Sequence, residues 1–329
     1  MREITPEAYQ RFLAQYGKVT VGQVRIRLLG PQRPRSLQPP GFKTEATTLW
    51  SFPKRGTWAT HRASYRGNWA PQIARNLILR YSSPGDTVLD QMVGGGTTLV
   101  ECKLTSRHGI GVDINRDALM LTMDRLNFSL PRSGLEEVPP VDIRLYHGDA
   151  RNLDAIPDGS IDLIATHPPY ASIIRYSQKS GDVPSRSLEE SRGGEGRQGG
   201  RRGHVPPANA DLSHVRSIAE FATQMRLVAD EAYRVLKPDH YCAILVGDTR
   251  RSRHYVPIAF RVLQSFLDAG FVLKEDIIKA QWNTQTEGLW ANLSRKKNFL
   301  LIMHEHLFVL RKPTAGERLR PYRESMAWW

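Results

Sequence analysis

Residues 86–115 read DTVLDQMVGGGTTLVECKLTSRHGIGVDIN, and this stretch decides the fold. The apolar run at 86–90 has the length of a buried strand, and three glycines follow shortly after it. Residues 97–107 then suit a helix, and 109–115 form a second short apolar run. A strand, a glycine turn, a helix and a strand in this order predict a parallel pair of strands joined by a crossover helix.

The same alternation continues to residue 312. The apolar runs at 271–282 and 299–312 follow each other without a helix, so they predict an antiparallel edge strand. The pattern as a whole predicts an α/β protein with a Rossmann-like, doubly wound, mostly parallel sheet. The other expected helices and strands alternate at 73–81, 117–130, 141–150, 161–166, 217–238, 241–248 and 257–270.

Composition bounds the class of protein. The chain has 329 residues, of which 40% are hydrophobic, and no apolar run approaches the roughly 20 residues of a membrane span. The first residues, MREITPEAYQRFLAQYG, are charged and mixed, so we expect no secretory signal and a cytoplasmic protein. Cys102 and Cys242 are the only cysteines, which excludes a cysteine-based zinc site and argues against a disulfide framework. The net charge of +13 favours a polyanionic partner, most often nucleic acid.

Three regions differ in composition. Residues 1–60 are rich in Pro and Arg and show no sustained period, which predicts a mostly irregular accessory region. The strand–helix alternation marks 61–312 as the main domain, and 313–329 as a C-terminal tail. A Gly- and Arg-rich insertion at about 178–212 has too little apolar surface to fold alone. It is either an inert linker or a loop that orders on phosphates.

Glycines and acidic residues stand where the predicted strands end. Glycine lets the chain turn tightly and lets a ligand approach the backbone closely. Asp113 ends the second strand about 23 residues after Asp90, where a carboxylate can accept hydrogen bonds from ribose hydroxyls. Asp149 follows the third strand and either accepts from an adenine amino group or caps the next turn. These positions suit a nucleotide-type cofactor, although a tight turn without a ligand also fits residues 94–96.

The strand at 161–166 ends abruptly in His-Pro-Pro-Tyr, residues 167–170, where two prolines exclude both helix and sheet ladder. Together with DQMVGGGTT, this HPPY tetrapeptide resembles the signatures of S-adenosylmethionine-dependent DNA amino-methyltransferases, the N4-cytosine and N6-adenine DNA methylases. Their signatures are a glycine turn like DPFxGSGTT and Asp/Asn/Ser-Pro-Pro-Tyr/Phe/Trp. The resemblance covers about residues 61–312. It implies a catalytic domain with the class I methyltransferase fold and a seven-stranded sheet, S-adenosylmethionine as cofactor and double-stranded DNA as partner.

The resemblance also implies roles for the tetrapeptide. The His167 side chain and the Pro168 carbonyl accept hydrogen bonds from the amino group of the target base, and Pro169 helps to fix that carbonyl. Tyr170 stacks on the base after it is flipped out of the duplex. The family has Asp, Asn or Ser where this chain has His167. Only a neutral imidazole can accept, so we expect activity to fall in acid as His167 becomes protonated, unless His167 merely caps the turn.

The cofactor is implied to lie against the glycine turn and a cover segment, YRGNWAPQIARNLI. Trp69 and Pro71 are then near the methionine part of the cofactor, whereas core packing is the alternative for Trp69. Gln91 and Met92 replace the family's Pro-Phe, and Gly95 replaces its Ser. The expected cofactor-binding residues are Asp90, Gly94, Gly95, Gly96, Thr97, Thr98, Asp113, Asp149, Trp69 and Pro71.

Basic residues in three loops are candidates for contacts with DNA phosphates, although the loop at 245–257 could equally be a solvated basic turn. His304 and His306 share one face of a predicted strand without an evident third ligand, so we expect no metal. The expected DNA-binding residues are Arg197, Arg201, Arg202, Arg250, Arg251, Lys296 and Lys297.

The sequence therefore predicts a site-specific DNA methyltransferase. THPPY is closest to the TSPPY form of the family, which leans toward N4 of cytosine and leaves N6 of adenine open. An RNA base amino-methyltransferase and an inactive nucleic-acid-binding relative are the alternatives. No separate target-recognition domain is visible, so either a short recognition site or a partner fits, such as a restriction enzyme or a specificity subunit.

Overall fold

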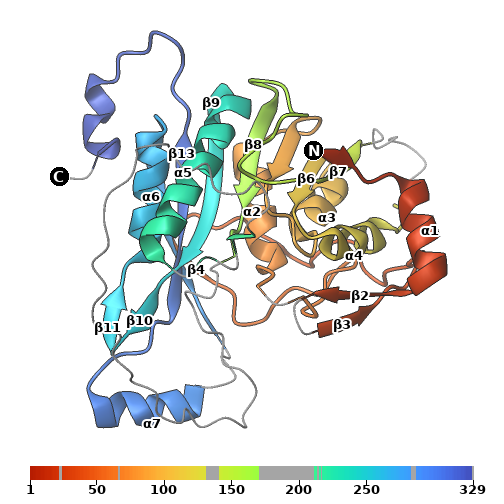
Figure 1. Ribbon diagram of the computed structural model, residues 1–329, viewed down its shortest axis with the longest axis horizontal. Helices are drawn as coiled ribbons and strands as arrows, with labels where there is room; N and C mark the ends of the chain where they lie inside the picture. Colours follow the sequence, from red (N-terminus) through yellow and green to blue (C-terminus); the bar gives the residue numbers. More distant parts are fainter. Residues whose placement is uncertain are drawn as a thin grey trace, which may run out of the picture.

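The computed structural model describes residues 1–21, 24–65, 67–130, 141–169, 211, 212, 215, 217–282 and 287–327. Its centre is a nine-stranded sheet with helices on both faces (Figure 1). In spatial order the strands are β1 (Arg2–Glu3), β7 (Ile143–His147), β6 (His108–Asp113), β5 (Thr87–Asp90), β8 (Ile161–Thr166), β9 (Leu236–Gly247), β13 (His304–Arg311), β12 (Val272–Ala280) and β4 (Leu49–Ser51).

The predicted doubly wound, mostly parallel sheet is confirmed, with two differences of detail. Strands β7, β6, β5, β8 and β9 are mutually parallel, as the crossover helices require. The antiparallel strand β13 lies between β9 and β12 rather than at the edge. The short strands β1 and β4 extend the seven expected strands to nine, and β1 is an antiparallel edge. Strands of two and three residues show no period that a sequence could reveal.

The helices form two cores on the two faces of the sheet. On one face lie α1 (Pro6–Tyr16), α2 (Pro71–Tyr81), α3 (Thr97–Leu104) and α4 (Arg116–Leu126), which bury residues such as Ile73 and Met120. On the other face lie α5 (Ile218–Val235) and α6 (Ile258–Asp268), which bury Val228 and Phe266. Because both faces are covered, all six residues of β8 are buried, and this explains the continuous apolar run at 161–166.

The strand order reverses between β5 and β8. From β5 the chain moves outward to β6 and β7, and from β8 it moves the other way to β9. Ligands of open parallel sheets bind at the carboxyl ends of the strands beside such a reversal. Asp90 ends β5 and His167 directly follows β8, so the two sequence motifs flank this point.

Residues 1–60 are more regular than expected. They form α1, the hairpin of β2 (Lys18–Val21) and β3 (Val24–Arg27), and the two outer strands β1 and β4, and they bury Tyr9 and Trp50. Figure 1 shows α1 and the hairpin beside α4. The division into regions 1–60, 61–312 and 313–329 stays a prediction. The remaining elements are β10 (Thr249–Arg251), β11 (His254–Val256), α7 (Glu287–Lys297) and the 3-10 helix η3 (Arg320–Ser325).

None of the described helices is both long enough and apolar enough to cross a membrane.

Candidate functional site

The glycine turn between β5 and α3 is a tightly packed backbone loop. Gly94 and Gly96 have positive φ angles of 50° and 77°, which residues with a side chain rarely adopt. A Cβ on Gly95 would lie 2.3 Å from Nη1 of Arg125, and one on Gly96 would lie 2.6 Å from Cγ2 of Thr122. The backbone conformation thus favours glycine at residues 94 and 96, and the neighbouring side chains leave little space for a Cβ at all three positions.

We expect Gly96→Ala to destabilise the protein by about 2–5 kcal/mol, the sum of left-handed strain and a clash with Thr122. Gly85→Ala is the matched control, because Gly85 has a similar φ of 87° but a Cβ added to it would meet nothing within 4 Å. That control should lose only about 1–2 kcal/mol. Denaturant unfolding of both variants measures the difference, and equal losses would show that Thr122 does not confine the turn.

Hydrogen bonds tie the two strand ends of the site together through Asp90. Its carboxylate accepts from the Thr98 hydroxyl at 2.6 Å and from the Thr166 hydroxyl at 3.1 Å. Thr98 belongs to the first turn of α3, whereas Thr166 is the last residue of β8 and precedes His167. The Thr97 hydroxyl bonds instead to the side chain of Asn68 in the cover segment. Thr98 thus connects the glycine turn to the sheet, and Thr97 connects it to the cover segment.

Asp113 ends β6 directly beside the glycine turn. Its carboxylate accepts from the backbone N–H groups of Gly94 and Asn115, both at 2.8 Å. A carboxylate has about four lone-pair positions, so two donors leave capacity for hydroxyl donors of a ligand. Burial raises the pKa of Asp90 and that of Asp113 to about 6. The backbone N–H bonds that Asp113 accepts oppose this rise but do not cancel it.

The cover segment packs on both motifs. Trp69 is buried, and its ring stacks on that of His167 with centroids 5.9 Å apart and planes 23° apart. Pro71 is the first residue of α2, where a missing N–H costs nothing. Tyr65, which the sequence did not single out, lies with its ring against Gly94 and Gly95. Burial raises the pKa of Tyr65, and the nearby Asp113 carboxylate adds to the rise.

His167 is held as a neutral imidazole. Burial lowers its pKa to about 4, despite the nearby Glu305 carboxylate, which favours the protonated form. A hydrogen bond to the Gly67 backbone also involves this ring. We therefore expect the neutral form to be lost at a lower pH than in a free imidazole, because desolvation penalises the imidazolium. The ring becomes protonated only as the pH falls through about 4.

Buried Glu305 and half-buried Lys279 form an ion pair near His167. Nζ of Lys279 donates to Oε2 of Glu305 at 2.8 Å, and both charges act on the imidazole. Glu305 lies between His304 and His306 on β13. His306 bonds through Nδ1 to Asp276 at 3.0 Å, which gives this ring a structural role. Among the described residues, no three His, Cys, Asp or Glu side chains are grouped to hold a metal ion.

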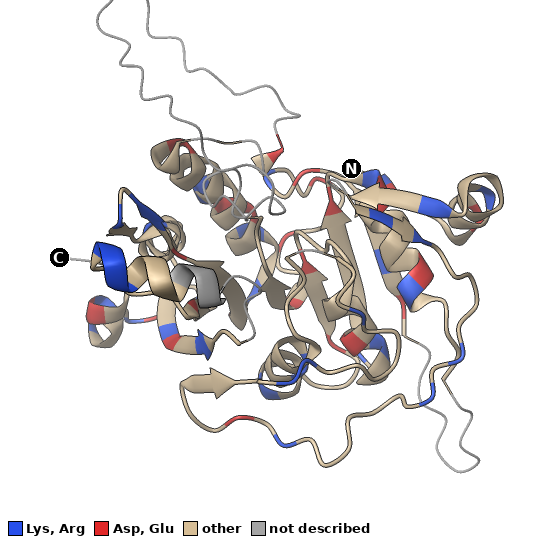
Figure 2. Ribbon diagram, turned by 90° about the horizontal axis from the view of Figure 1, so that it is seen from below, with Lys and Arg blue, Asp and Glu red and all other residues tan. Residues whose placement is uncertain are grey.

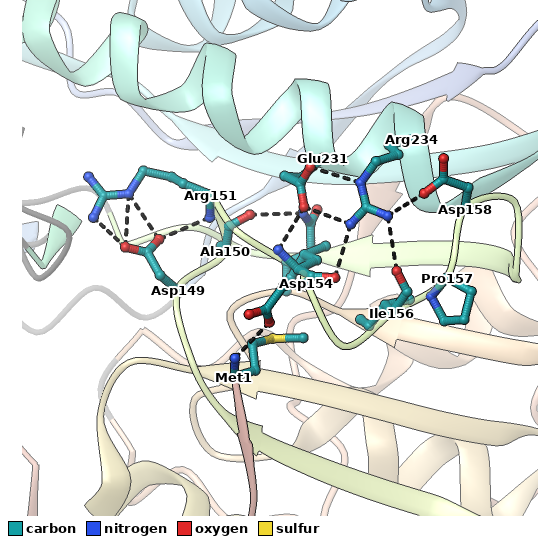
Figure 3. A network of polar contacts seen from close by, with 12 residues as sticks. Met1, Asp149, Ala150, Arg151, Asp154, Ile156, Pro157, Asp158, Glu231 and Arg234 are labelled. Atoms are coloured by element: carbon teal, nitrogen blue, oxygen red, sulfur yellow. Dashed lines mark hydrogen bonds and ion pairs between the residues drawn. The ribbon is translucent and has the colours of Figure 1, made fainter. Parts of the chain in front are cut away.

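Asp149 is already paired. Its carboxylate accepts from Nε of Arg151 at 2.9 Å and also from Nη2, in the forked arrangement that Figure 3 shows. Nη1 of Arg151 also donates to the side chain of Gln224 in α5, so the pair holds the loop after β7 against α5. The predicted contact between Asp149 and an adenine amino group stays a prediction, and that amino group would share the carboxylate with Arg151.

The expected DNA contacts lie in separate loops. Tyr170 and the arginines at 197, 201 and 202 are outside the described residues. Arg250 rests over the rings of Tyr255 and Phe299 at 5.8 and 5.7 Å from their centroids, which ties the β10–β11 hairpin to the residues after α7. Arg251 is exposed in β10, and Lys296 and Lys297 are exposed at the end of α7. Their contacts with DNA stay predictions.

A DNA methylase family model matches residues 23–124 and 161–324, which is more than half of the chain. Two curated relatives are Type II methyltransferases. M.HpaI of Haemophilus parainfluenzae is 32% identical over 81 residues, which cover 25% of this chain and 26% of that protein. M.MjaII of Methanocaldococcus jannaschii is 28% identical over 121 residues, which cover 32% of this chain and 23% of that protein.

These matches span only about a quarter of the length of each curated relative. Among solved structures, a SAM-dependent methyltransferase from Methanosarcina mazei aligns with 13% identity and a TM-score of 0.42. That alignment covers 72% of this chain and 96% of the other.

Proposed function

The chain belongs to the DNA methylase family, and from this premise we propose that it transfers a methyl group to the exocyclic amino group of a base in DNA. The cofactor is S-adenosylmethionine, as in the family. N4 of cytosine is slightly favoured over N6 of adenine, because THPPY is closest to the TSPPY form. Double-stranded DNA is the proposed substrate, and a restriction enzyme or specificity subunit is a proposed partner.

The observation that carries this proposal is the meeting of two motifs at one reversal of the sheet. The glycine turn with Asp113 stands at the ends of β5 and β6, and His167-Pro168-Pro169 follows β8. The residues fit the cofactor, because the Asp113 carboxylate at the end of β6 accepts from only two backbone N–H groups and suits ribose hydroxyls. When bound, S-adenosylmethionine supplies an activated methyl group on its sulfonium.

The tetrapeptide would prepare the nucleophile. An exocyclic amino nitrogen is a poor nucleophile because its lone pair is delocalised into the ring of the base. Acceptors on its N–H bonds draw that lone pair back to nitrogen, and we assign this task to the His167 ring and the Pro168 carbonyl. A pKa near 4 makes His167 a weak base but keeps it in the accepting form at neutral pH. Tyr170 is proposed to stack on the flipped base.

Cofactor affinity should fall in mild acid. Ribose hydroxyls bind the ionised form of Asp113, whose pKa without cofactor is about 6, so Kd should rise by up to tenfold for each pH unit below about 6. The stability of the cofactor-free protein depends on pH in the opposite direction. Because the pKa of Asp113 is higher in the folded than in the unfolded protein, its protonation stabilises the fold at a pH below the unfolded pKa, and this contribution is lost as the pH rises through about 6. S-adenosylmethionine should therefore raise the Tm more at pH 7.5 than at pH 5.5.

Isothermal titration calorimetry from pH 5 to pH 8 measures this effect. Asp113→Asn should flatten the part of the profile that Asp113 causes, and any slope that persists would belong to Asp90, whose pKa is also raised to about 6. A Kd that stays constant from pH 5 to pH 8 in the unmodified protein would contradict a ribose bound by either carboxylate.

The function is tested by transfer of labelled methyl groups from S-adenosylmethionine to duplex DNA and, in parallel, to RNA. We expect label in DNA. Label found only in RNA would overturn the proposal in favour of an RNA methyltransferase. Cofactor binding without transfer to either polymer, over many DNA sequences, would favour an inactive relative.

A further inference from the structure

A basic cavity lies beside the site, on residues that no motif had marked. It has a volume of about 700 Å³ and opens between the segments 33–40 and 54–62. Its lining holds no acidic residue but five cations, which are Arg33, Arg35, Lys54, Arg55 and Arg62. Blue positions recur along the extended segment that joins β3 to β4 (Figure 2). We call these five residues and the space between them the basic cavity.

The charges of the basic cavity are not balanced within the described part of the chain. None of the five cations takes part in an ion pair there, whereas other arginines such as Arg234 and Arg311 have two carboxylate partners each. Arg33, Arg35, Lys54 and Arg62 are exposed, so their repulsion is screened by solvent. Five like charges around one hollow nevertheless produce a positive potential that attracts an anion.

Arg55 makes the strongest case for an anion. Its side chain is half-buried, and burial lowers its pKa to about 10, so the charged form lacks solvation. Nη1 donates to the carbonyl of Asn68 at 2.9 Å, but Nε is buried and has no hydrogen-bond partner within the described residues. A guanidinium that is partly withdrawn from water without a carboxylate is costly unless an anion completes its surroundings.

The basic cavity is fixed next to the candidate site. Strand β4 runs parallel to β12, so the chain after Ser51 leaves the sheet at the carboxyl edge, as does the chain after β8. Gln72 in the first turn of α2 then holds the segment. Its Oε1 accepts from Gly56 N at 3.0 Å, and its Nε2 donates to the Lys54 carbonyl at 2.8 Å.

A short chain of contacts leads from the basic cavity to the catalytic tetrapeptide. Arg55 bonds to the backbone of Asn68, and the next residue, Trp69, stacks on His167. Asn68 also contacts Thr97 of the glycine turn. A ligand in the basic cavity would thus lie next to the cover segment that packs on His167.

We propose that the basic cavity binds backbone phosphates of the nucleic-acid strand whose base enters the site. This inference rests on the proposed function and adds to it a contact surface in residues 33–62. Four of the five cations are arginines, whose planar fork matches phosphate oxygens with two parallel hydrogen bonds. A continuous strand, rather than a free nucleotide, fits cations that are spread over two segments along an open hollow.

The test compares two triple variants of equal charge. The cavity variant is Arg33→Ala, Arg35→Ala and Lys54→Ala, and the control variant is Arg318→Ala, Arg320→Ala and Lys274→Ala. The control cations are also exposed, but they lie after β13 and at the start of β12, at the opposite edge of the sheet. Fluorescence anisotropy with duplex DNA at several salt concentrations gives the slope of log Kd against log salt.

Each phosphate contact adds about 0.9 to that slope, so the cavity variant should lose roughly 2–3 and the control variant should lose little. S-adenosylmethionine affinity should remain unchanged in both, which also shows that both fold. A cavity variant with the slope of the unmodified protein would overturn the inference. Tripolyphosphate serves as a second probe. If the cavity variant lost binding of tripolyphosphate but kept the full salt slope for DNA, the cavity would bind a free polyphosphate, and the inference would again be overturned. Failure of the proposed function would appear instead in the unmodified protein, as an absence of DNA binding and methyl transfer.

Discussion

His167→Ala is expected to lower kcat for methyl transfer by about 10²–10³-fold, the usual cost of losing one preorganised polar group at a reacting centre. The ring lies at the end of β8, beneath Trp69, and desolvation keeps it neutral. Its loss removes one of two proposed acceptors on the target amino group and leaves Asp113 with its hydrogen bond to the glycine turn in place. The Kd for S-adenosylmethionine should therefore stay within about twofold, while single-turnover transfer slows.

Two controls separate chemistry from packing. His167→Asn supplies an amide oxygen as acceptor, as in relatives with Asn at this position, and should recover activity to within about tenfold of the unmodified protein. His167→Phe keeps an aromatic ring against Trp69 without an acceptor and should be as slow as His167→Ala. If His167→Phe were fully active, the ring would be a packing element, and the acceptor role would be withdrawn.

Asp113→Ala should raise the Kd for S-adenosylmethionine by at least about 10²-fold. Hydrogen bonds to a charged acceptor contribute about 1.5–3 kcal/mol each, and a ribose offers two hydroxyl donors. The same change leaves Gly94 N without the acceptor that it has at 2.8 Å, which loosens the glycine turn as well. Both effects act on binding, so saturating cofactor should restore a large part of kcat.

Asp142→Ala is the matched control for that change. Asp142 is an exposed carboxylate that pairs with exposed Arg144 at the start of β7, away from the glycine turn. Calorimetric titration of both variants should show a weakened site only in Asp113→Ala. Equal affinities in the two variants would place the ribose elsewhere in the protein.

The strand–helix alternation was enough to predict the centre of the sheet. Strand β8, for example, is a continuous apolar run because both faces of the sheet are covered, and helices such as α5 show a clear period. The outer strands β1 and β4 could not be found in this way. They have two and three residues, and they are strands only because β7 and β12 offer a free edge to pair with.

The site was predictable where its residues are local in the sequence. Residues 94–96 stand out as a run of three glycines, and residues 167–169 stand out as a His-Pro-Pro run at the end of an apolar strand. Tyr65 and Glu305 could not be assigned, since their proximity to Gly94 and His167 arises from the folded chain. One signal was available but unused: Arg151, two residues after Asp149, is placed to pair with that carboxylate.

The pKa of His167 is another property of the site that could not be predicted from the sequence. The sequence identifies a histidine in an acceptor position, but the burial that moves its pKa from about 6.5 to about 4 depends on Trp69 and the surrounding sheet. Folding thus makes this unusual residue a stable substitute for an uncharged acceptor over the whole neutral range. With His167 as the titrating group, methyl transfer should stay constant from pH 7 to 8.5.

The most direct test of the proposed function is mass spectrometry of nucleosides from duplex DNA that has been incubated with the protein and labelled S-adenosylmethionine. We predict labelled N4-methylcytosine or N6-methyladenine, because the arrangement at His167 and Pro168 addresses an exocyclic amino group. Label on a ring carbon of cytosine, or DNA without label although the cofactor binds and many sequences are offered, would contradict the account.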